Sequence, residues 1–482
     1  MSSPVRRMVQ TWVSMGPKYL PFADVATPDL PMSRLLRLSL FQVTVGMALV
    51  LLVGTLNRVM IVELGVPASV VAVMLALPLI FAPLRALIGF RSDTHRCALG
   101  WRRVPFIWKG TLMQFGGFAI MPFAILVLAG QGESSMTPAW IGYSSAALAF
   151  LLVGAGVHMV QTVGLALATD LTPPESHPKV VGLMYVMLLV GMIVSALVFG
   201  AVLSEFSPGR LVQVIQGAAV LTVFLNMAAM WKQEQRHARR TTAPESDPTF
   251  AESWAMFCAG DGAIRRLVVV GLGTMAFCMS DVLLEPFGGQ VLNLSVSSTT
   301  RLTALLALGG LAGFAYASAT LSRGANAYHV SRTGLLVGLP AFALVILAVP
   351  LSQPALFLIG NVLIGFGGAL FGHATLTATM NRAPANQAGL ALGAWGAVQA
   401  TAAGIGMALS GIIRDLVNLS LGEQAGQWGY ATQAEGYLAV YAIEIGLLIV
   451  CAVALLPLIR RVGKSAKTPI SSYGEPTSQT AS

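Results

Sequence analysis

The sequence predicts an all-α polytopic membrane protein, on the strength of its composition and the length of its apolar runs. Of its 482 residues, 55% are hydrophobic and only 10% are charged, whereas soluble domains carry about 25% charged residues. The chain also holds 50 glycines, which let helices approach each other closely in lipid. These features argue against a soluble enzyme.

Apolar runs of about 20 residues, the length that crosses a hydrocarbon core of roughly 30 Å, predict twelve membrane helices. The first six are expected at 35–61, 67–90, 104–129, 138–169, 178–204 and 209–231. The second six are expected at 264–288, 298–321, 331–351, 354–380, 388–414 and 435–459. The polar, Pro-rich start of the chain has no apolar core of a cleavable leader, so the first helix is expected to direct insertion.

The basic residues predict that both termini face the cytoplasm, because cytoplasmic loops retain Lys and Arg during insertion. In that orientation four arginines lie at the outer side, two basic residues lie within helices, and all others face the cytoplasm. The four are Arg58, Arg210, Arg301 and Arg414, and the two are Arg85 and Lys109.

The predicted domains are a cytoplasmic segment 1–34, a six-helix half 35–231, a cytoplasmic linker 232–263, a second half 264–459 and a tail 460–482. The first segment carries an apolar helical face, typical of an interfacial anchor or of a helix that docks on a partner. That face comprises Val5, Met8, Val9, Trp12 and Val13.

The two halves show signs of an internal repeat with an offset of 211 residues. Gly154 and Gly156 in the fourth helix correspond to Gly365 and Gly367 in the tenth. At the ends of the same helices, the pairs Asp170 with Asn381 and Pro173 with Pro384 keep the same offset. Two parallel six-helix repeats predict the major facilitator superfamily fold.

The loop after the second helix resembles the superfamily's loop between helices 2 and 3. It reads GFRSDTHRCALGWRR, with a glycine, an aspartate four residues later, and a second glycine before two arginines. The second glycine comes later than in ordinary transporters. The glycine permits close helix packing, and the carboxylate can meet a helix N-terminus of the other half. We therefore expect a cytoplasmic gate formed by Gly89, Asp93, Arg96, Gly100, Arg102 and Arg103.

The sequence around this loop resembles one branch of the superfamily more specifically. The stretches LPFADVATPDLP, RALIGFRSDTHRCALGWRRVPFIWKGTLMQFGG and VGAGVHMVQTVGLALATDLTPPESHPKVVGLMYVM are similar to the PucC/LhaA group of light-harvesting complex assembly proteins, the bacteriochlorophyll-delivery branch. The similarity extends over about residues 18–460.

The resemblance implies a non-enzymatic assembly factor in the inner, intracytoplasmic photosynthetic membrane of a purple bacterium. It implies that the protein delivers bacteriochlorophyll, as cargo, to antenna polypeptides or helps to insert them. Bacteriochlorophyll synthase, the membrane insertion machinery and lipids are the further partners implied. The client is either the core antenna, as for LhaA, or the peripheral antenna, as for PucC, and the motifs do not separate the two.

Two histidines are candidate pigment ligands. His158 lies about 12 residues from the end of the fourth helix, or roughly 18 Å, near the membrane midplane, and His373 lies on the tenth. A neutral imidazole can ligate the magnesium of a chlorin, and Gln161 follows His158 on the same helical face. The alternative is that each histidine bonds to a neighbouring helix.

Ionisable groups also fall inside predicted helices, where charge is costly; they include Arg85, Lys109 and Glu444. Arg85 and Lys109 are near helix ends and can extend to the headgroups. Glu444 is deeper in the twelfth helix, and serves either as a structural hydrogen-bonding group or as a proton-coupling carboxylate. A proton-coupled secondary transporter that uses Glu444 or Asp281 is therefore the rival prediction.

A periplasmic gate is predicted between Arg58 and the pair Asp281 and Glu285, which share a helical face. The alternative is local pairing, of Arg58 with Glu63 and of Glu285 with Arg301. We find no nucleophile triad, phosphate-binding loop or metal-ligand cluster, and no CxxC spacing among the four cysteines. The basic residues form short clusters between apolar runs, which argues against nucleic acid as a partner.

Overall fold

The computed structural model describes residues 31–80, 88, 92, 101–130, 137–172, 177–234, 255, 258–260, 262–381, 388–421 and 434–465. Within these ranges, eleven helices are long and apolar enough to cross a membrane, and a shorter apolar helix covers Ala68–Leu79. That shorter helix lies in the predicted second span, whose remainder falls largely outside the described residues. The prediction of an all-helical, multi-pass membrane protein is confirmed.

The first half begins with a compound helix. It consists of α2 (Met32–Leu38), α3 (Leu40–Leu49) and two π-helical segments, η2 (Val50–Leu56) and η3 (Val59–Glu63). The remaining helices of this half are α4 (Ala68–Ile80), α6 (Val104–Leu128), α7 (Ala139–Asp170), α8 (His177–Val202) and α9 (Pro208–Met230). The π-helical turns are a departure from the predicted regular helix, and such turns are frequent at functional sites.

The second half also begins with a compound helix, made of α11 (Ala263–Cys278), the 3₁₀ turn η6 (Ser280–Val282) and α12 (Leu284–Gln290). It continues with α13 (Val296–Ser322), α14 (Ala327–Leu347), α15 (Pro354–Met380), α16 (Ala388–Leu421) and α17 (Ala434–Ser465). The N-terminal segment 1–30, with its predicted interfacial face, most of the linker 232–263 and most of the tail 460–482 lie outside the described residues.

Among the described residues, four predicted helix boundaries are wrong by four residues or more, and local contacts explain one of them. Helix α14 ends at Leu347 rather than 351, and α17 ends at Ser465 rather than 459. Helix α14 begins at Ala327 rather than 331, because the Asn326 side chain accepts a hydrogen bond from the backbone N–H of Tyr328 and caps the helix. Helix α16 continues to Leu421, so Arg414 lies inside the helix rather than at its end.

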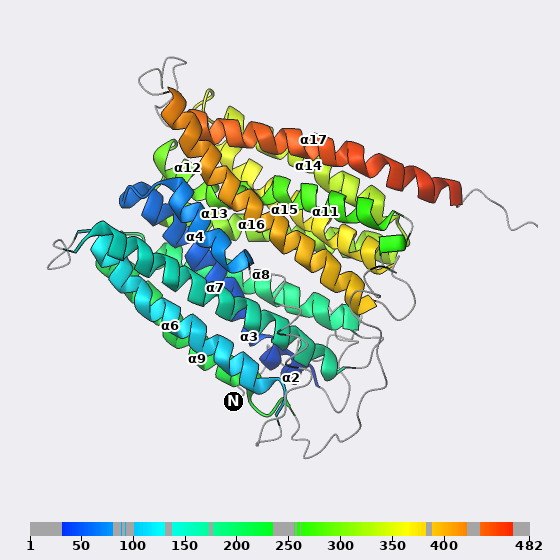
Figure 1. Ribbon diagram of the computed structural model, residues 1–482, viewed down its shortest axis with the longest axis horizontal. Coiled ribbons are helices and arrows are strands. Elements are labelled where there is room, and N and C mark those ends of the chain that lie inside the picture. The colour runs from blue at the N-terminus through cyan, green and yellow to red at the C-terminus, as the bar shows by residue number, and fades with distance from the viewer. Residues whose placement is uncertain are drawn as a thin grey trace, which may run out of the picture.

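The helices are arranged as two bundles (Figure 1). The bundles meet at the end where α12 ends and α13 begins, and they diverge toward the end where α2 begins and α17 ends. We call the end where α2 begins and α17 ends the terminus side. The opposite end, where α12 ends and α13 begins, is the far end. Helices α4 and α16 pack together, as do α8 and α13, and these two pairs join the halves.

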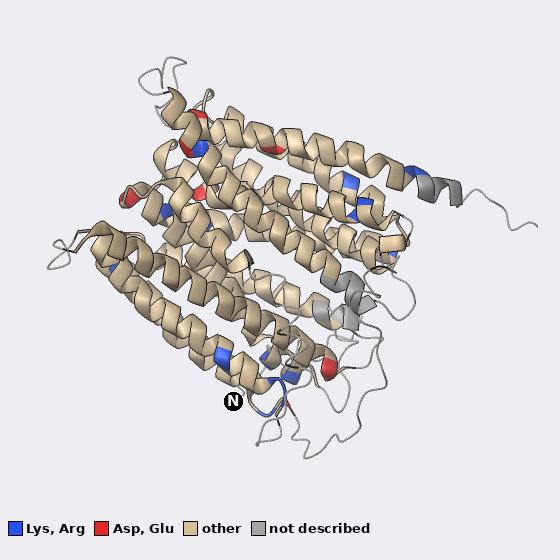
Figure 2. Cartoon of the chain, in the orientation of Figure 1, with Lys and Arg blue, Asp and Glu red and all other residues tan. Residues whose placement is uncertain are grey.

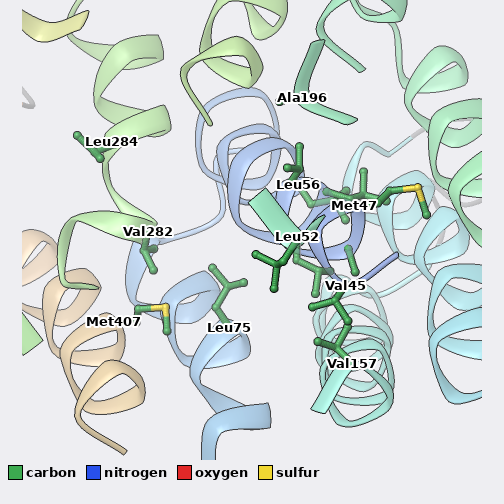
Figure 3. Close-up of a cluster of buried hydrophobic side chains, with 14 of the residues drawn as sticks. Val45, Met47, Leu52, Leu56, Leu75, Val157, Ala196, Val282, Leu284 and Met407 are labelled. Atoms are coloured by element: carbon green, nitrogen blue, oxygen red, sulfur yellow. The ribbon is translucent and has the colours of Figure 1, made fainter. Parts of the chain in front are cut away.

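The first compound helix is the most buried in the protein's described part. Buried side chains along it, such as Val45 and Leu56, belong to the same apolar cluster as Val282 and Met407 of the second half (Figure 3). Because one continuous core joins the halves, the contacts of this helix affect how the halves sit against each other.

The internal repeat is visible in the helix packing. The position of a Cβ on Gly156 of α7 would be 2.5 Å from the Gly110 carbonyl oxygen of α6, and one on Gly367 of α15 would be 2.9 Å from that of Gly334 of α14. The third and fourth helices of each half thus cross at a pair of glycines. Similarly, Gly154 packs on α4 and Gly365 on α13, which is the second helix in each half.

Charged side chains gather toward the two ends of the helices, and the long stretches between are nearly free of charge (Figure 2). This distribution is what a lipid environment demands, since an ionised group in hydrocarbon is costly. The few charged or polar groups inside the helices are therefore the residues to examine for function.

Candidate functional site between the two halves

Arg58 is held at the far end by its own half and by the other half. Its Nη1 donates to Glu63 Oε1, and its Nη2 donates to the backbone carbonyl of Leu294, at 3.2 Å. The Arg58 side chain is 4% exposed, whereas that of Glu63 is 36% exposed. Of the two pairings predicted for Arg58, the structure has the local one with Glu63, and the ion pair with Asp281 or Glu285 is absent among the described contacts.

Glu285 has a neutral partner instead of an arginine. The Thr303 hydroxyl of α13 donates to its carboxylate at 2.9 Å, and both side chains are buried. The predicted link from Arg58 is not formed, because Glu63 binds Arg58 and Thr303 binds the Glu285 carboxylate. Arg58 still joins the halves, but through the backbone carbonyl of Leu294.

The seventh membrane span consists of α11, η6 and α12, and its helix is broken at η6. This break is the main local feature that hydropathy does not reveal. Proline has no N–H, so Pro286 cannot pair with the carbonyl of Val282, four residues earlier. The Asn57 side-chain amide fills this role from the first helix, with Nδ2 donating to the Val282 carbonyl oxygen at 2.6 Å. Asn57 is fully buried, so the bond is a polar link between the two halves inside the core.

Gln290 is a second link between the halves, at the end of α12. Its side-chain oxygen accepts from Arg414 Nη2 and from the Tyr437 hydroxyl, each at 2.7 Å. Its side-chain nitrogen donates to the carbonyl of Ile61 at 3.5 Å. Helices from both halves therefore converge on one amide at the far end.

Asp415 forms a third link nearby. Its carboxylate pairs with Arg414 at 2.7 Å and accepts from the backbone N–H of Ser69, in the first turn of α4, at 2.7 Å. A carboxylate at a helix N-terminus is electrostatically favourable. The sequence did not single out Asn57, Gln290 or Asp415 as functional residues. The signal that could have found them is a polar side chain inside or beside an apolar run.

The two arginines of the predicted cytoplasmic gate bind within their own half. Arg102 Nη2 and Arg103 Nε both contact the Asp170 carboxylate at the end of α7, at 2.6 and 3.0 Å. Arg103 also donates to Ser92 at 2.6 Å. In the described part of the chain these contacts join the third and fourth helices of one half, and the gate between the halves stays a prediction.

Glu234 completes this junction from just beyond α9. Its carboxylate accepts from the backbone N–H groups of Arg102, Arg103 and Val104, at 2.8 to 3.0 Å. These are the unpaired donors at the start of α6, so Glu234 caps that helix. The other members of the predicted gate, Gly89, Asp93, Arg96 and Gly100, lie outside the described residues, as does Arg85.

Lys109 behaves as its position near a helix end suggests. Its side chain is exposed on α6, and Nζ lies 5.6 Å from the centroid of the Phe106 ring. The aromatic ring and the flexible stem let the ammonium reach toward the headgroups while the helix stays in the apolar region.

The two candidate histidines lie on corresponding helices, and both are only partly buried. His158 and Gln161 are on α7, while His373 is on α15. The His373 ring packs against Phe314 of α13, with centroids 4.4 Å apart. A Cβ on Gly372, the preceding residue of α15, would meet no atom within 4 Å.

Glu444 is fully buried on α17. Neither of its carboxyl oxygens has a hydrogen-bond partner in the described part of the structure. Ser280 and Asp281, at the break of the seventh span, lie against it. The structure therefore places Glu444 near Asp281 and away from any described arginine or lysine, an arrangement that sequence alone did not predict.

Comparison with known proteins identifies the family. The family described as "PUCC protein" matches residues 55–463. The chain belongs to the PucC family. It is 62% identical to Protein PucC of Rhodovulum sulfidophilum over 409 residues, covering 84% of this chain and 90% of that one. It is 60% identical to Protein PucC of Rhodobacter capsulatus over 454 residues, covering 93% and 97%.

Solved structures show that this PucC family member has the major facilitator fold. A peptide transporter POT in complex with sulfate superposes with a TM-score of 0.66 at 13% identity, covering 92% of this chain and 99% of that one. A bacterial homologue of the lysosomal transporter Spinster, inward-facing and occupied, gives a TM-score of 0.65 at 16% identity, covering 92% and 100%. The predicted superfamily fold is confirmed.

Proposed function

We propose that this protein is a non-enzymatic assembly factor for a bacterial light-harvesting antenna, acting in the inner photosynthetic membrane. The observation that carries the proposal is its membership of the PucC family over residues 55–463. Antenna polypeptides are the proposed partners, with bacteriochlorophyll synthase, insertion machinery and lipids beside them. A weaker similarity favours this setting, since the "Bacteriochlorophyll synthase 44.5 kDa chain" of Rhodobacter capsulatus is 27% identical over 426 residues.

Both termini are proposed to face the cytoplasm. Arg34, Arg37, Arg102 and Arg103 lie at the terminus side of the first half, and Arg265 and Arg266 lie at the start of α11. The terminus side therefore carries more basic residues than the far end. This difference supports the orientation, because cytoplasmic loops retain Lys and Arg.

The proposed client is the peripheral antenna. Two proteins of one organism, Rhodobacter capsulatus, differ in their similarity to this chain. Protein PucC is 60% identical, whereas the "Uncharacterized protein in puhA-bchM intergenic region" is 49% identical over 466 residues. The sequence is therefore nearer to the PucC branch, for which the peripheral antenna is the expected client.

Bacteriochlorophyll is the proposed cargo, held near His158, Gln161 and His373. The support is positional: each half contributes a partly buried imidazole from its fourth helix. The Phe314 ring beside His373 offers a flat apolar surface of the kind on which a macrocycle packs. An imidazole nitrogen would supply a ligand to the magnesium of the pigment.

The experiment is gentle purification from a phototrophic membrane, followed by identification of the bound polypeptides and the near-infrared absorption spectrum. The proposal expects antenna polypeptides and bacteriochlorophyll in the purified sample. A sample with neither, but with proton uptake linked to the movement of a small solute, would favour the proton-coupled transporter and contradict the proposal.

A further inference from the structure

The carboxyl group of Glu444 is the most isolated acid in the described part of the protein. Both of its oxygens are buried without a hydrogen-bond partner, as is the hydroxyl of Tyr441, one turn earlier on α17. The hydroxyl and the backbone N–H of Ser280 face the carboxyl, but the hydroxyl donates to the carbonyl of Phe277, at 3.1 Å, so the donors nearest to the acid are neutral. An ionised carboxylate in this position is very costly unless it is paired.

No described cation is placed to pair with Glu444. Around it, the seventh span contributes Cys278 and Asp281, and α17 contributes Tyr441. None of these groups carries a positive charge, and an ionised Asp281 opposes a negative charge on Glu444.

The other helices packed against α17 do not supply the missing cation. Arg414 of α16 is occupied by Asp415, Gln290 and Tyr437. On α14, the titratable side chains Tyr328, His329 and Arg332 all lie in the first two turns, at the terminus side. The site therefore suits a carboxylic acid that carries its proton.

Glu444 lies close to two of the contacts that join the halves at the far end. Ser280 and Asp281 form the turn next to Glu444, and the following residue, Val282, accepts the buried hydrogen bond from Asn57. On α17, Tyr437 lies seven residues before Glu444, about 10 Å along the helix, and donates to Gln290. Two of the links between the halves are thus attached to segments that flank the acid.

We propose that Glu444 is a proton-binding site that holds the far end closed while it is protonated. Loss of the proton leaves a buried charge that needs water or a cation, which the closed arrangement does not provide. Asp281, which is partly exposed at the break, is the group through which the proton enters and leaves. The far end is therefore closed at mildly acidic pH and opens as the pH rises.

The first test is infrared spectroscopy of the purified full chain in lipid nanodiscs. The protonated-carboxyl band of the wild type is expected to persist at neutral pH, and the component of that band due to Glu444 is expected to be absent from Glu444→Gln. Glu205, whose side chain is 82% exposed at the same end and pairs with Arg210, provides the control, and Glu205→Gln is expected to keep the band. Absence of the band in the wild type would overturn the proposal.

The second test measures the far end directly. Spin labels at Ser204→Cys and Gln353→Cys, exposed positions at the far end of each half, report the distance between the halves in a background without native cysteines. In the wild type and in Glu205→Gln, a longer distance is expected to become populated as the pH rises. In Glu444→Gln, which mimics the protonated acid, the short distance is expected at every pH.

The outcomes separate this proposal from its alternatives. A wild-type distance that does not respond to pH overturns it, and so does a Glu444→Gln variant that responds like the wild type. A response to sodium at fixed pH would identify a cation site instead and would also overturn it. If Glu444→Gln does not fold, Asp281→Asn is used, and it is expected to slow the pH response; an unchanged rate contradicts the proposed route.

Discussion

The side-chain amide of Asn57 takes the place of the backbone N–H that Pro286 lacks, donating to the Val282 carbonyl at 2.6 Å. The bond crosses from the first helix of one half to the seventh span of the other. Because Asn57 is fully buried, water cannot replace it when the partner is removed. The carbonyl freed by the helix break thus forms a hydrogen bond between the halves.

Asn57→Ala is expected to destabilise the protein by about 1–3 kcal/mol, the cost of leaving a buried carbonyl without a donor. In a Pro286→Ala background the cost should fall, since residue 286 then supplies an N–H to the same carbonyl. Thermal unfolding of the four proteins in this double-mutant cycle measures the coupling. Equal costs of Asn57→Ala in both backgrounds would show that Pro286 is not the reason for the bond.

Glu234→Ala is expected to lower the unfolding temperature, because three backbone N–H groups at the start of α6 lose their acceptor. Loss of a helix cap costs about 1–2 kcal/mol. The control is Glu205→Ala, which removes an exposed ion pair with Arg210 and should have a smaller effect. Similar unfolding temperatures for the two variants would contradict the capping role.

Two adjacent glycines of α6 provide a matched test of helix packing. A Cβ on Gly117 would be 2.7 Å from the carbonyl oxygen of Ala149 on α7, whereas one on Gly116 would meet nothing within 4 Å. Gly117→Ala should therefore destabilise the first half by about 1–3 kcal/mol, and Gly116→Ala should be neutral or slightly stabilising. Unfolding curves that shift equally would refute the close α6–α7 contact.

The double variant His158→Leu and His373→Leu is expected to lower the ratio of bacteriochlorophyll to protein after purification, since the magnesium loses its nitrogen ligands. His329→Leu, at an exposed histidine in the first turn of α14, is the control and should leave the ratio unchanged. An unaltered ratio in a folded double variant would show that pigment is held by shape alone.

The sequence predicted the helices well because lipid imposes a long apolar run on each of them, and the glycines that repeat at an offset of 211 residues predicted the two halves. The break at Ser280 to Val282 was missed because the whole segment stays apolar enough to cross a membrane in spite of Asp281 and Glu285. Only Pro286 marks it, and a proline inside a membrane helix often leaves the helix intact when another group satisfies the freed carbonyl.

The candidate site was predicted less completely, because its contacts join residues far apart in the chain. Arg58 and Glu63 are five residues apart, so their pairing could be proposed. Glu234 caps a helix that begins at Val104, and no spacing rule connects two such positions. The partner of Arg102 and Arg103 was likewise not predictable, because Asp170 at the end of α7 lies more than 60 residues away in the chain.

The central claim, assembly of the peripheral antenna, is tested most directly by the near-infrared absorption of membranes from a deletion strain, with and without this chain restored. We expect the peripheral-antenna bands to be lost on deletion and to return with the wild-type chain at matched expression. The genes for the antenna polypeptides should still be transcribed in the deletion strain. Normal peripheral-antenna absorption in the absence of the protein would contradict the proposed function.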